Sequence, residues 1–164
     1  MMVETAIEQA TSFEVRRATP ADRDALVAMY RSFAPKGACL GLPPRRDPER
    51  WLDSLSPYPN FLIEATGRVI GHAVLCTDGD SAEIAVFVHQ DYRGRGLGKR
   101  LLSEAIAEAR RLGLARIWGM TELDNVPMLR LAHSLGFVSG KDPREFYLDL
   151  REQTPTEEGR IPAA

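Results

Sequence analysis

Cysteine is scarce in this chain of 164 residues, and the two cysteines, Cys39 and Cys76, lie in segments of different character. Cys39 falls in a loop rich in glycine and proline, whereas Cys76 ends an apolar run and is expected to be buried. Two such cysteines make neither a disulfide framework nor a metal site. The three histidines share no metal-ligand spacing, and His72, within an expected strand, is best explained as a core residue. We therefore expect no bound metal.

Long apolar runs and a large excess of one charge are also missing. No apolar run approaches the roughly 20 residues needed to span a bilayer. Residues 1–12 include acidic side chains and do not form a cationic, apolar leader. The formal net charge of −2 provides no field that would recruit nucleic acid or an anionic membrane. We expect a cytoplasmic protein that binds neither nucleic acid nor a membrane.

The order of helix and strand patterns indicates a mixed α/β (α+β) fold. Three consecutive strands within residues 61–88 are expected to form an antiparallel meander. A helix over 98–112 then leads to a strand over 115–120, an order that implies a parallel pair with a right-handed crossover. We expect a mostly antiparallel sheet of about six or seven strands, splayed where a ligand enters, with helices on both faces. Further strands are expected at 13–18 and 145–150, and further helices from Pro20, over 48–56 and over 125–135.

The chain is expected to hold one domain, residues 13–150, between flexible tails at 1–12 and 151–164. Within it, residues 34–48 contain four prolines and two glycines and form a long irregular loop. Loops of this length are uncommon unless they serve a function. We expect the loop to line a binding site, where its cations are Lys36, Arg45 and Arg46.

The most informative stretch is DYRGRGLGKR, residues 91–100, which lies between an expected strand and an expected helix. Glycines at 94, 96 and 98 leave the loop backbone free to approach a ligand closely. The N–H groups of the loop stand at a helix N-terminus, where the helix dipole favours anions. In physical terms this loop is a cradle for a pyrophosphate. Positive charge is added by Arg93, Arg95, Lys99 and Arg100.

Two common phosphate-binding patterns do not fit this loop. The third glycine comes one residue too early for the Rossmann spacing G-x-G-x-x-G. The Walker spacing fails because the stretch from Gly94 to Lys99 is too short, and Arg100 stands where a serine or threonine should hold magnesium. The preceding strand belongs to an antiparallel meander, which also disfavours both patterns. A solvated basic turn, with glycines needed only for its geometry, stays open as the alternative.

Two blocks of the sequence resemble the GNAT superfamily of N-acetyltransferases. Residues 93–98, RGRGLG, are similar to its signature R/Q-x-x-G-x-G/A, and residues 125–137, NVPMLRLAHSLGF, are similar to its segment N-x-x-(A/M)-x-x-L-x-x-x-L-G-F. The resemblance implies acetyl-CoA as co-substrate, without a metal, with its pyrophosphate in the loop and its pantetheine arm near Asn125. The cofactor-binding residues expected on this basis are Val86, Val88, Arg93, Gly94, Arg95, Gly96, Leu97, Gly98, Lys99, Asn125 and Met128.

The acetyl transfer that this resemblance implies needs a general base. An amine attacks only when it is neutral, whereas a lysine amine has a pKa of about 10.4. Glu83 is the first candidate, because it opens the strand that runs into the cradle and its apolar neighbours should raise its pKa. Glu122, after the next strand, is the second. For each, a solvated carboxylate without a catalytic role stays the alternative.

A general acid is harder to find in the sequence. Many members of the superfamily place a tyrosine directly after the leucine that corresponds here to Leu131. This chain has Ala132 at that position. The resemblance therefore implies that water or another group protonates the thiolate of CoA.

A narrower resemblance concerns the acceptor. Residues 82–88, 119–121 and 128–132 are similar to the acetyltransferase domain of bacterial protein-lysine acetyltransferases. This implies N-acetyl transfer from acetyl-CoA to a protein lysine. Two alternatives remain: a small amine or amino-acid derivative as the acceptor, and a non-catalytic acyl-CoA-binding module that senses the cofactor. A homodimer is left open as the assembly.

Overall fold

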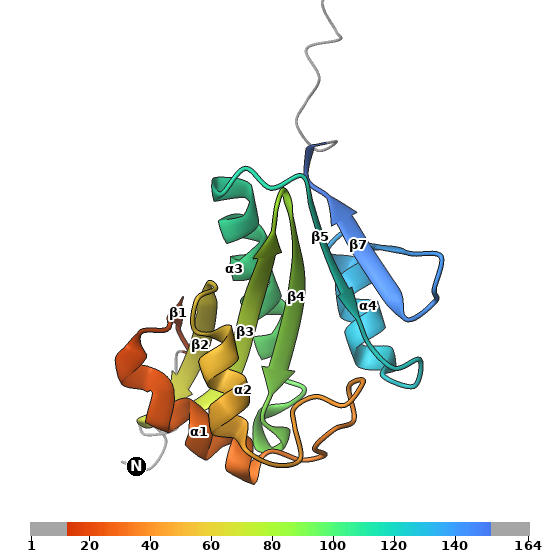
Figure 1. Cartoon of the computed structure of the whole chain (residues 1–164). Coiled ribbons are helices and arrows are strands. Elements are labelled where there is room, and N and C mark those ends of the chain that lie inside the picture. The colour runs from red at the N-terminus through yellow and green to blue at the C-terminus, as the bar shows by residue number, and fades with distance from the viewer. Residues whose placement is uncertain (1–12, 152–164) are drawn as a thin grey trace, which may run out of the picture.

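Seven strands form one mixed sheet in the computed structural model, which describes residues 13–151 (Figure 1). Their order is β1-β2-β3-β4-β5-β7-β6, and all neighbouring pairs are antiparallel except β4 and β5, which are parallel. The expected sheet and its parallel pair are therefore confirmed. The tails expected at 1–12 and 151–164 lie, apart from residue 151, outside the described residues. The strands are β1 (Val15–Arg17), β2 (Asn60–Ala65), β3 (Arg68–Asp78), β4 (Ser81–Val88), β5 (Arg116–Met120), β6 (Val138–Ser139) and β7 (Glu145–Asp149).

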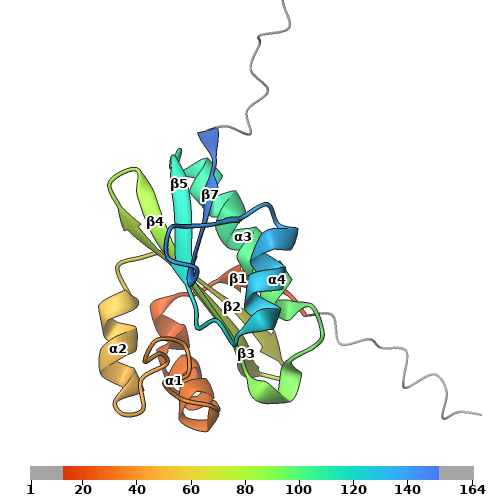
Figure 2. The same cartoon turned by 90° about the vertical axis from the view of Figure 1, so that its right-hand side faces the viewer.

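Helices cover both faces of this sheet, as expected. Figure 2 shows α1 and α2 on one face and α3 and α4 on the other. Helix α3 is the crossover between β4 and β5, and its leucines and alanines at helical spacing are buried against the sheet. Within residues 13–151, no helix is both long and apolar enough to cross a membrane. The helices are α1 (Arg23–Ser32), α2 (Pro48–Leu55), α3 (Leu97–Arg111) and α4 (Val126–Ser134), with the 3₁₀ helices η1 (Pro20–Asp22) and η2 (Gln90–Tyr92).

The side chains of β4 alternate between the two faces, and this alternation decides where the candidate site residues point. Ala82 and Ile84 pack in the core beneath α3. Phe87 packs on the other face, where its ring centroid lies 5.9 Å from that of Tyr30 in α1. Because successive strand residues point to opposite faces, Glu83 shares the face of α1 and α2 with Phe87.

A buried polar chain joins α1 to the sheet. The Tyr30 hydroxyl lies 2.5 Å from Nδ1 of His72, and Nε2 of His72 lies 2.8 Å from Oδ1 of Asn60. Both Tyr30 and His72 are fully buried, and burial lowers the pKa of His72 to about 3. The imidazole is therefore neutral near pH 7, so the hydroxyl donates to Nδ1 and Nε2–H donates to the amide oxygen. The expectation that His72 is a core residue is confirmed.

Several elements differ from the expected ones for local reasons. The strand expected over 13–18 shortens to β1, because only three of its residues pair with β2. The helix expected from Pro20 opens as η1, where the Asp22 carboxylate accepts a 2.7 Å hydrogen bond from the N–H of Thr19. The sequence did not indicate η2 or β6, and β6 is only two residues long. Cys76 is half-buried instead of buried, near the end of β3 that lies away from α1 (Figure 1).

We expect Tyr30→Phe to lower the free energy of unfolding by about 1–3 kcal/mol, because the buried Nδ1 of His72 loses its hydrogen-bond donor. Urea unfolding followed by circular dichroism measures this loss. Tyr58→Phe is the matched control, since the Tyr58 hydroxyl makes no hydrogen bond within residues 13–151. Equal losses in the two variants would contradict the role of the buried chain.

Candidate active site

Strands β4 and β5 pair over a short stretch and then diverge (Figure 1). The pairing ends at Glu83, which faces Trp118. From there on β5 continues with β7, and Gly119 lies so close to Phe146 that an added Cβ would fall 2.6 Å from a ring atom. Residues 84–88 keep β3 as their only strand partner in the described part of the chain. This edge of β4 therefore offers backbone N–H and C=O groups to an extended ligand.

The loop after β4 leads to an uncapped helix N-terminus. Gly94 and Gly96 have φ angles of 76° and 77°, a conformation that glycine adopts without strain. An added Cβ at either residue would meet nothing within 4 Å, so both face open space. No side chain caps α3 at Gly96, and its first turn holds no acidic residue. The N–H groups at the positive end of the helix dipole are thus available to an anion. Exposed cations near this end are Arg95, Lys99 and Arg100.

Close packing accounts for the rest of the glycine-rich motif. Leu97 begins α3 and is buried, with 2% of its surface exposed. Gly98 lies against α4, because an added Cβ would fall 3.3 Å from Cδ2 of Leu131. Ala132, at the position where the resemblance led us to look for a tyrosine, is fully buried. The glycine at 98 therefore lets two helices approach, whereas those at 94 and 96 leave the loop open.

Arg93 is turned toward the protein. Its Nε donates to the carbonyl of Val88 at 3.0 Å, and its Nη2 donates to the carbonyl of Ala34 at 2.9 Å. The guanidinium also lies 5.2 Å above the ring of Phe33. Partial burial lowers the pKa of Arg93, although arginine remains charged near pH 7. The side chain thus fastens the loop to the segment that follows α1.

Glu83 lies where β4 and β5 separate. Its side chain is exposed, yet partial loss of water around the carboxylate raises its pKa above the usual value, in the direction expected from the sequence. The neighbours across the sheet are Cys76 on β3 and Trp118 on β5, both half-buried. The carboxylate thus combines access with raised basicity, as a general base requires.

The irregular segment between α1 and α2 reaches across to the end of β5. Sγ of Cys39 lies 3.8 Å from the carbonyl oxygen of Met120 and 3.7 Å from Oγ1 of Thr121. Burial raises the pKa of the Cys39 thiol, and the charges of Glu122 and Glu83 raise it further. The tip of this segment therefore lies near both candidate bases.

Other residues expected at the cofactor site lie on the side of α3 and α4. Val86 and Val88 are half-buried and pack into the core on the α3 face, and Met128 packs against the same side from α4. Asn125 caps α4, since its Oδ1 accepts from the N–H of Met128 at 3.4 Å. Its Nδ2 donates to Oγ1 of Thr121 at 2.9 Å. Asn125 thus links the start of α4 to the end of β5, where the two strands have separated.

Two aromatic residues near Glu83 were missed in the sequence. Trp118 on β5 faces Tyr147 on β7, and both are half-buried on the face that carries Glu83. The guanidinium of Arg116 lies 4.3 Å above the Tyr147 ring. The strand patterns predicted both strands, but only the register of the finished sheet places Trp118 next to Glu83 and Tyr147 one strand farther along the same face. Among residues 13–151, no group of three or more His, Cys, Asp or Glu side chains is placed to hold a metal.

Comparison with known proteins gives consistent results. Residues 25–137, well over half of the chain, match the model of the family described as "Acetyltransferase (GNAT) family". An L-methionine sulfoximine/L-methionine sulfone acetyltransferase of Salmonella typhimurium is 40% identical over 87 residues, which are 49% of this chain and 51% of the relative. A [ribosomal protein bS18]-alanine N-acetyltransferase of Escherichia coli is 31% identical over 104 residues, 63% of this chain and 66% of the relative. The chain thus spans about half to two thirds of these relatives.

One of the similar solved structures is yncA of Salmonella typhimurium, described as an acetyltransferase with its cofactor acetyl-CoA. The identity is 30% and the TM-score 0.70, with 85% of this chain and 94% of that chain covered.

We expect Gly96→Ala to weaken the binding of CoA by about tenfold or more, because the new side chain disfavours the positive φ that aims the loop N–H groups. Isothermal titration calorimetry measures the affinity. Gly113→Ala is the matched control: Gly113 has a φ of 71°, with open space around it, at the other end of α3. Both variants should lose on the order of 1 kcal/mol of stability. If the two variants bound CoA with equal affinity, the loop would not be part of the binding site.

Proposed function

This chain belongs to the acetyltransferase (GNAT) family, and on that basis we propose that it transfers the acetyl group of acetyl-CoA to the nitrogen of an amine. The observation that carries the proposal is the divergence of β4 and β5. A glycine-rich, basic helix N-terminus follows the end of β4, and Glu83 stands where the strands separate. These features suit two parts of an acyl-CoA, its pyrophosphate and its thioester, which the pantetheine arm connects. The proposed catalytic domain is residues 13–150, in the cytoplasm.

The residues present fit acetyl-CoA, which supplies an acetyl group activated as a thioester. The N–H groups of residues 94–98 are proposed to hold the pyrophosphate, with Arg95 and Lys99 as nearby cations. The unpaired edge of β4 at Val86 and Val88 is proposed to hydrogen-bond to the amides of the pantetheine arm, as a peptide strand would.

Two other residues of the expected cofactor site are proposed to act as positioning residues. Arg93 holds the loop through the Val88 and Ala34 carbonyls, and Asn125 fixes the start of α4. Each acts in the proposal by holding an element in place rather than by a charge directed at the ligand. Met128, on α4, is proposed to pack along the cofactor from that side.

Glu83 is the proposed general base. An amine arrives mostly protonated near pH 7, and a carboxylate with a raised pKa is better matched to take its proton, directly or through water. Glu122 stays the second candidate, since it too lies near the tip of the segment that holds Cys39. Ala132 has no proton to give, so protonation of the thiolate is assigned to water or another group.

The proposed acceptor is the amine of an amino acid or amino-acid analogue. The relative that is 40% identical is named for methionine sulfoximine and methionine sulfone, which are amino-acid analogues. The face beside Glu83 carries the half-buried rings of Trp118 and Tyr147, which suit an apolar group next to the amine.

A protein acceptor is the second candidate. The ribosomal-protein relative, named for alanine N-acetylation, favours a peptide amine, whereas neither curated relative is named for lysine. The protein lysine implied by the narrower resemblance therefore stays a prediction, as does a homodimer. A non-catalytic acyl-CoA sensor would have no need of a basic carboxylate at the point where the strands separate.

An acceptor panel tests the proposed function. We expect CoA release from acetyl-CoA with L-methionine sulfone, and a lower kcat/KM with glycine, because glycine has no side-chain methylenes to contact the Trp118 ring. A peptide with an N-terminal alanine and an N-terminally blocked peptide with one lysine complete the panel. Preference for the lysine peptide would overturn the assigned acceptor, and no CoA release with any amine would favour the sensor.

We expect Glu83→Gln to keep its affinity for acetyl-CoA and to lose about 10²–10⁴-fold in kcat, the usual contribution of a general base. The loss should shrink as pH rises, because more of the acceptor amine is then already neutral. Complete pH–rate profiles of the wild type and the variant with one acceptor measure this. Glu122→Gln is the control and should follow the wild-type profile. If the profile of Glu83→Gln superimposed on the wild type at every pH, Glu83 would not be the base.

A further inference from the structure

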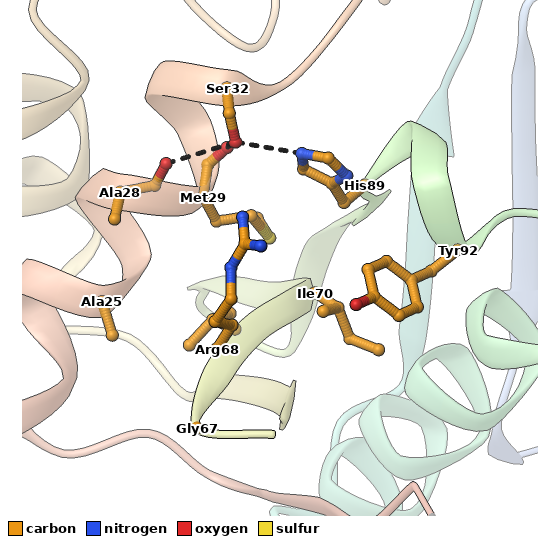
Figure 3. A pocket seen from close by; sticks show the side chains of 10 residues that line it. Ala25, Ala28, Met29, Ser32, Gly67, Arg68, Ile70, His89 and Tyr92 are labelled. Carbon is orange, nitrogen blue, oxygen red and sulfur yellow. Dashed lines mark hydrogen bonds between the residues drawn. The ribbon is translucent and has the colours of Figure 1, made fainter. Parts of the chain in front are cut away.

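A cavity lies outside the candidate active site. It has a volume of about 110 Å³ and lies between α1, the turn that joins β2 to β3, and η2. Figure 3 shows its lining residues. One side is apolar and is formed by Ala25, Ala28, Met29, Val69 and Ile70. None of these residues contributes to the divergence of β4 and β5.

The polar groups of this cavity converge from three elements. Arg68 extends from the β2–β3 turn into the cavity, toward Met29 and His89 (Figure 3). Its guanidinium makes no ion pair or hydrogen bond with any residue of the described part of the chain. The Tyr92 hydroxyl points inward toward Ile70 in the same view. An exposed cation that has no partner among residues 13–151 therefore stands beside an apolar wall.

The Ser32 hydroxyl can donate its hydrogen to a ligand while it still accepts a hydrogen bond from His89. His89, 5% exposed, accepts at Nδ1 from the N–H of Asp91 at 3.3 Å, so its proton is on Nε2 and is donated to Oγ of Ser32 at 3.0 Å. The Ser32 hydroxyl then donates to the carbonyl of Met29 at 3.2 Å. That hydrogen can turn to an anion in the cavity without breaking the bond from His89.

From this arrangement we propose that the cavity binds a small monocarboxylate with a short alkyl chain. Arg68 has the planar set of N–H donors that matches a carboxylate in a bidentate pair, and Ser32 supplies a further donor. The alkyl chain lies against the apolar side of the cavity, next to Met29 and Ile70. A volume of about 110 Å³ suits a chain of a few carbons.

The occupied cavity is also coupled to the glycine-rich loop. Tyr92 forms part of the cavity wall and carries the guanidinium of Arg95 on its ring, 5.3 Å from the centroid. His89 caps η2, which leads directly into the loop. A ligand that fixes Tyr92 therefore also restrains the loop residues 93–96, and the two sites affect each other's affinity.

The test is a titration of the isotopically labelled full chain with sodium butyrate, followed by NMR of the methyl groups of Met29 and Ile70 and the amides of Gly94 and Gly96. We expect saturable shifts of the methyl signals, and amide shifts that follow the same curve. Butyramide, which has the same shape without the charge, should produce neither.

Two arginine variants complete the test. Arg68→Gln should bind butyrate about tenfold or more weakly, because it loses a charge-assisted pair. Arg50→Gln, at an exposed arginine of α2, should bind as the wild type does. Both substitutions are at the surface, so an unchanged Tm verifies the fold. No saturable methyl shift, equal binding of butyramide, or equal binding by Arg68→Gln would overturn the site. Methyl shifts without amide shifts would overturn the coupling.

Discussion

The parallel strands β4 and β5 stay paired only as far as Glu83 and Trp118, and the rest of the site follows from the loss of pairing after that point. Helix α3 connects the two strands and packs on one face, while β5 turns away to pair with β7 along its length. Apart from the Val88 carbonyl, which accepts from Arg93, the backbone groups of the free edge must then be satisfied by water or by a ligand. A ligand that lies where the next strand would be can supply hydrogen-bond partners for this edge. An extended cofactor that carries amide groups therefore suits this fold.

Most of the fold and the loop motif could be predicted, because they depend on local patterns. Alternating residues in 61–88 predicted the meander, helical spacing in 98–112 predicted α3, and glycines before that helix predicted an open N-terminus. The ends of elements were less predictable. β1 is shorter than expected because its pairing with β2 stops, and β6 has only two residues. The sequence pattern does not indicate where either strand ends.

The surroundings of the candidate base depend on strand register and on contacts between segments that are distant in the sequence. Local sequence patterns predict neither of these. Glu83 was a candidate from its place in the chain, but only the sheet puts Trp118 beside it and Tyr147 one strand farther on the same face. Likewise the long loop was expected to border the site, whereas its anchor, the contact of Cys39 with Thr121, joins positions far apart in the sequence. Arg93 matches the motif, yet its side chain bonds to protein carbonyls.

The placement of the two tryptophans has an optical consequence. Trp51 is half-buried and packs edge-on against Tyr30, 4.9 Å between centroids, at the core around α1, whereas Trp118 stands beside Glu83 at the point where the strands separate. Their emission therefore reports different regions. In a chain with Trp51 replaced by phenylalanine, the remaining indole fluorescence comes from the sheet face beside the candidate base. Its wavelength and quenching by iodide follow the hydration of that face, so the wetting of the site can be observed without a label.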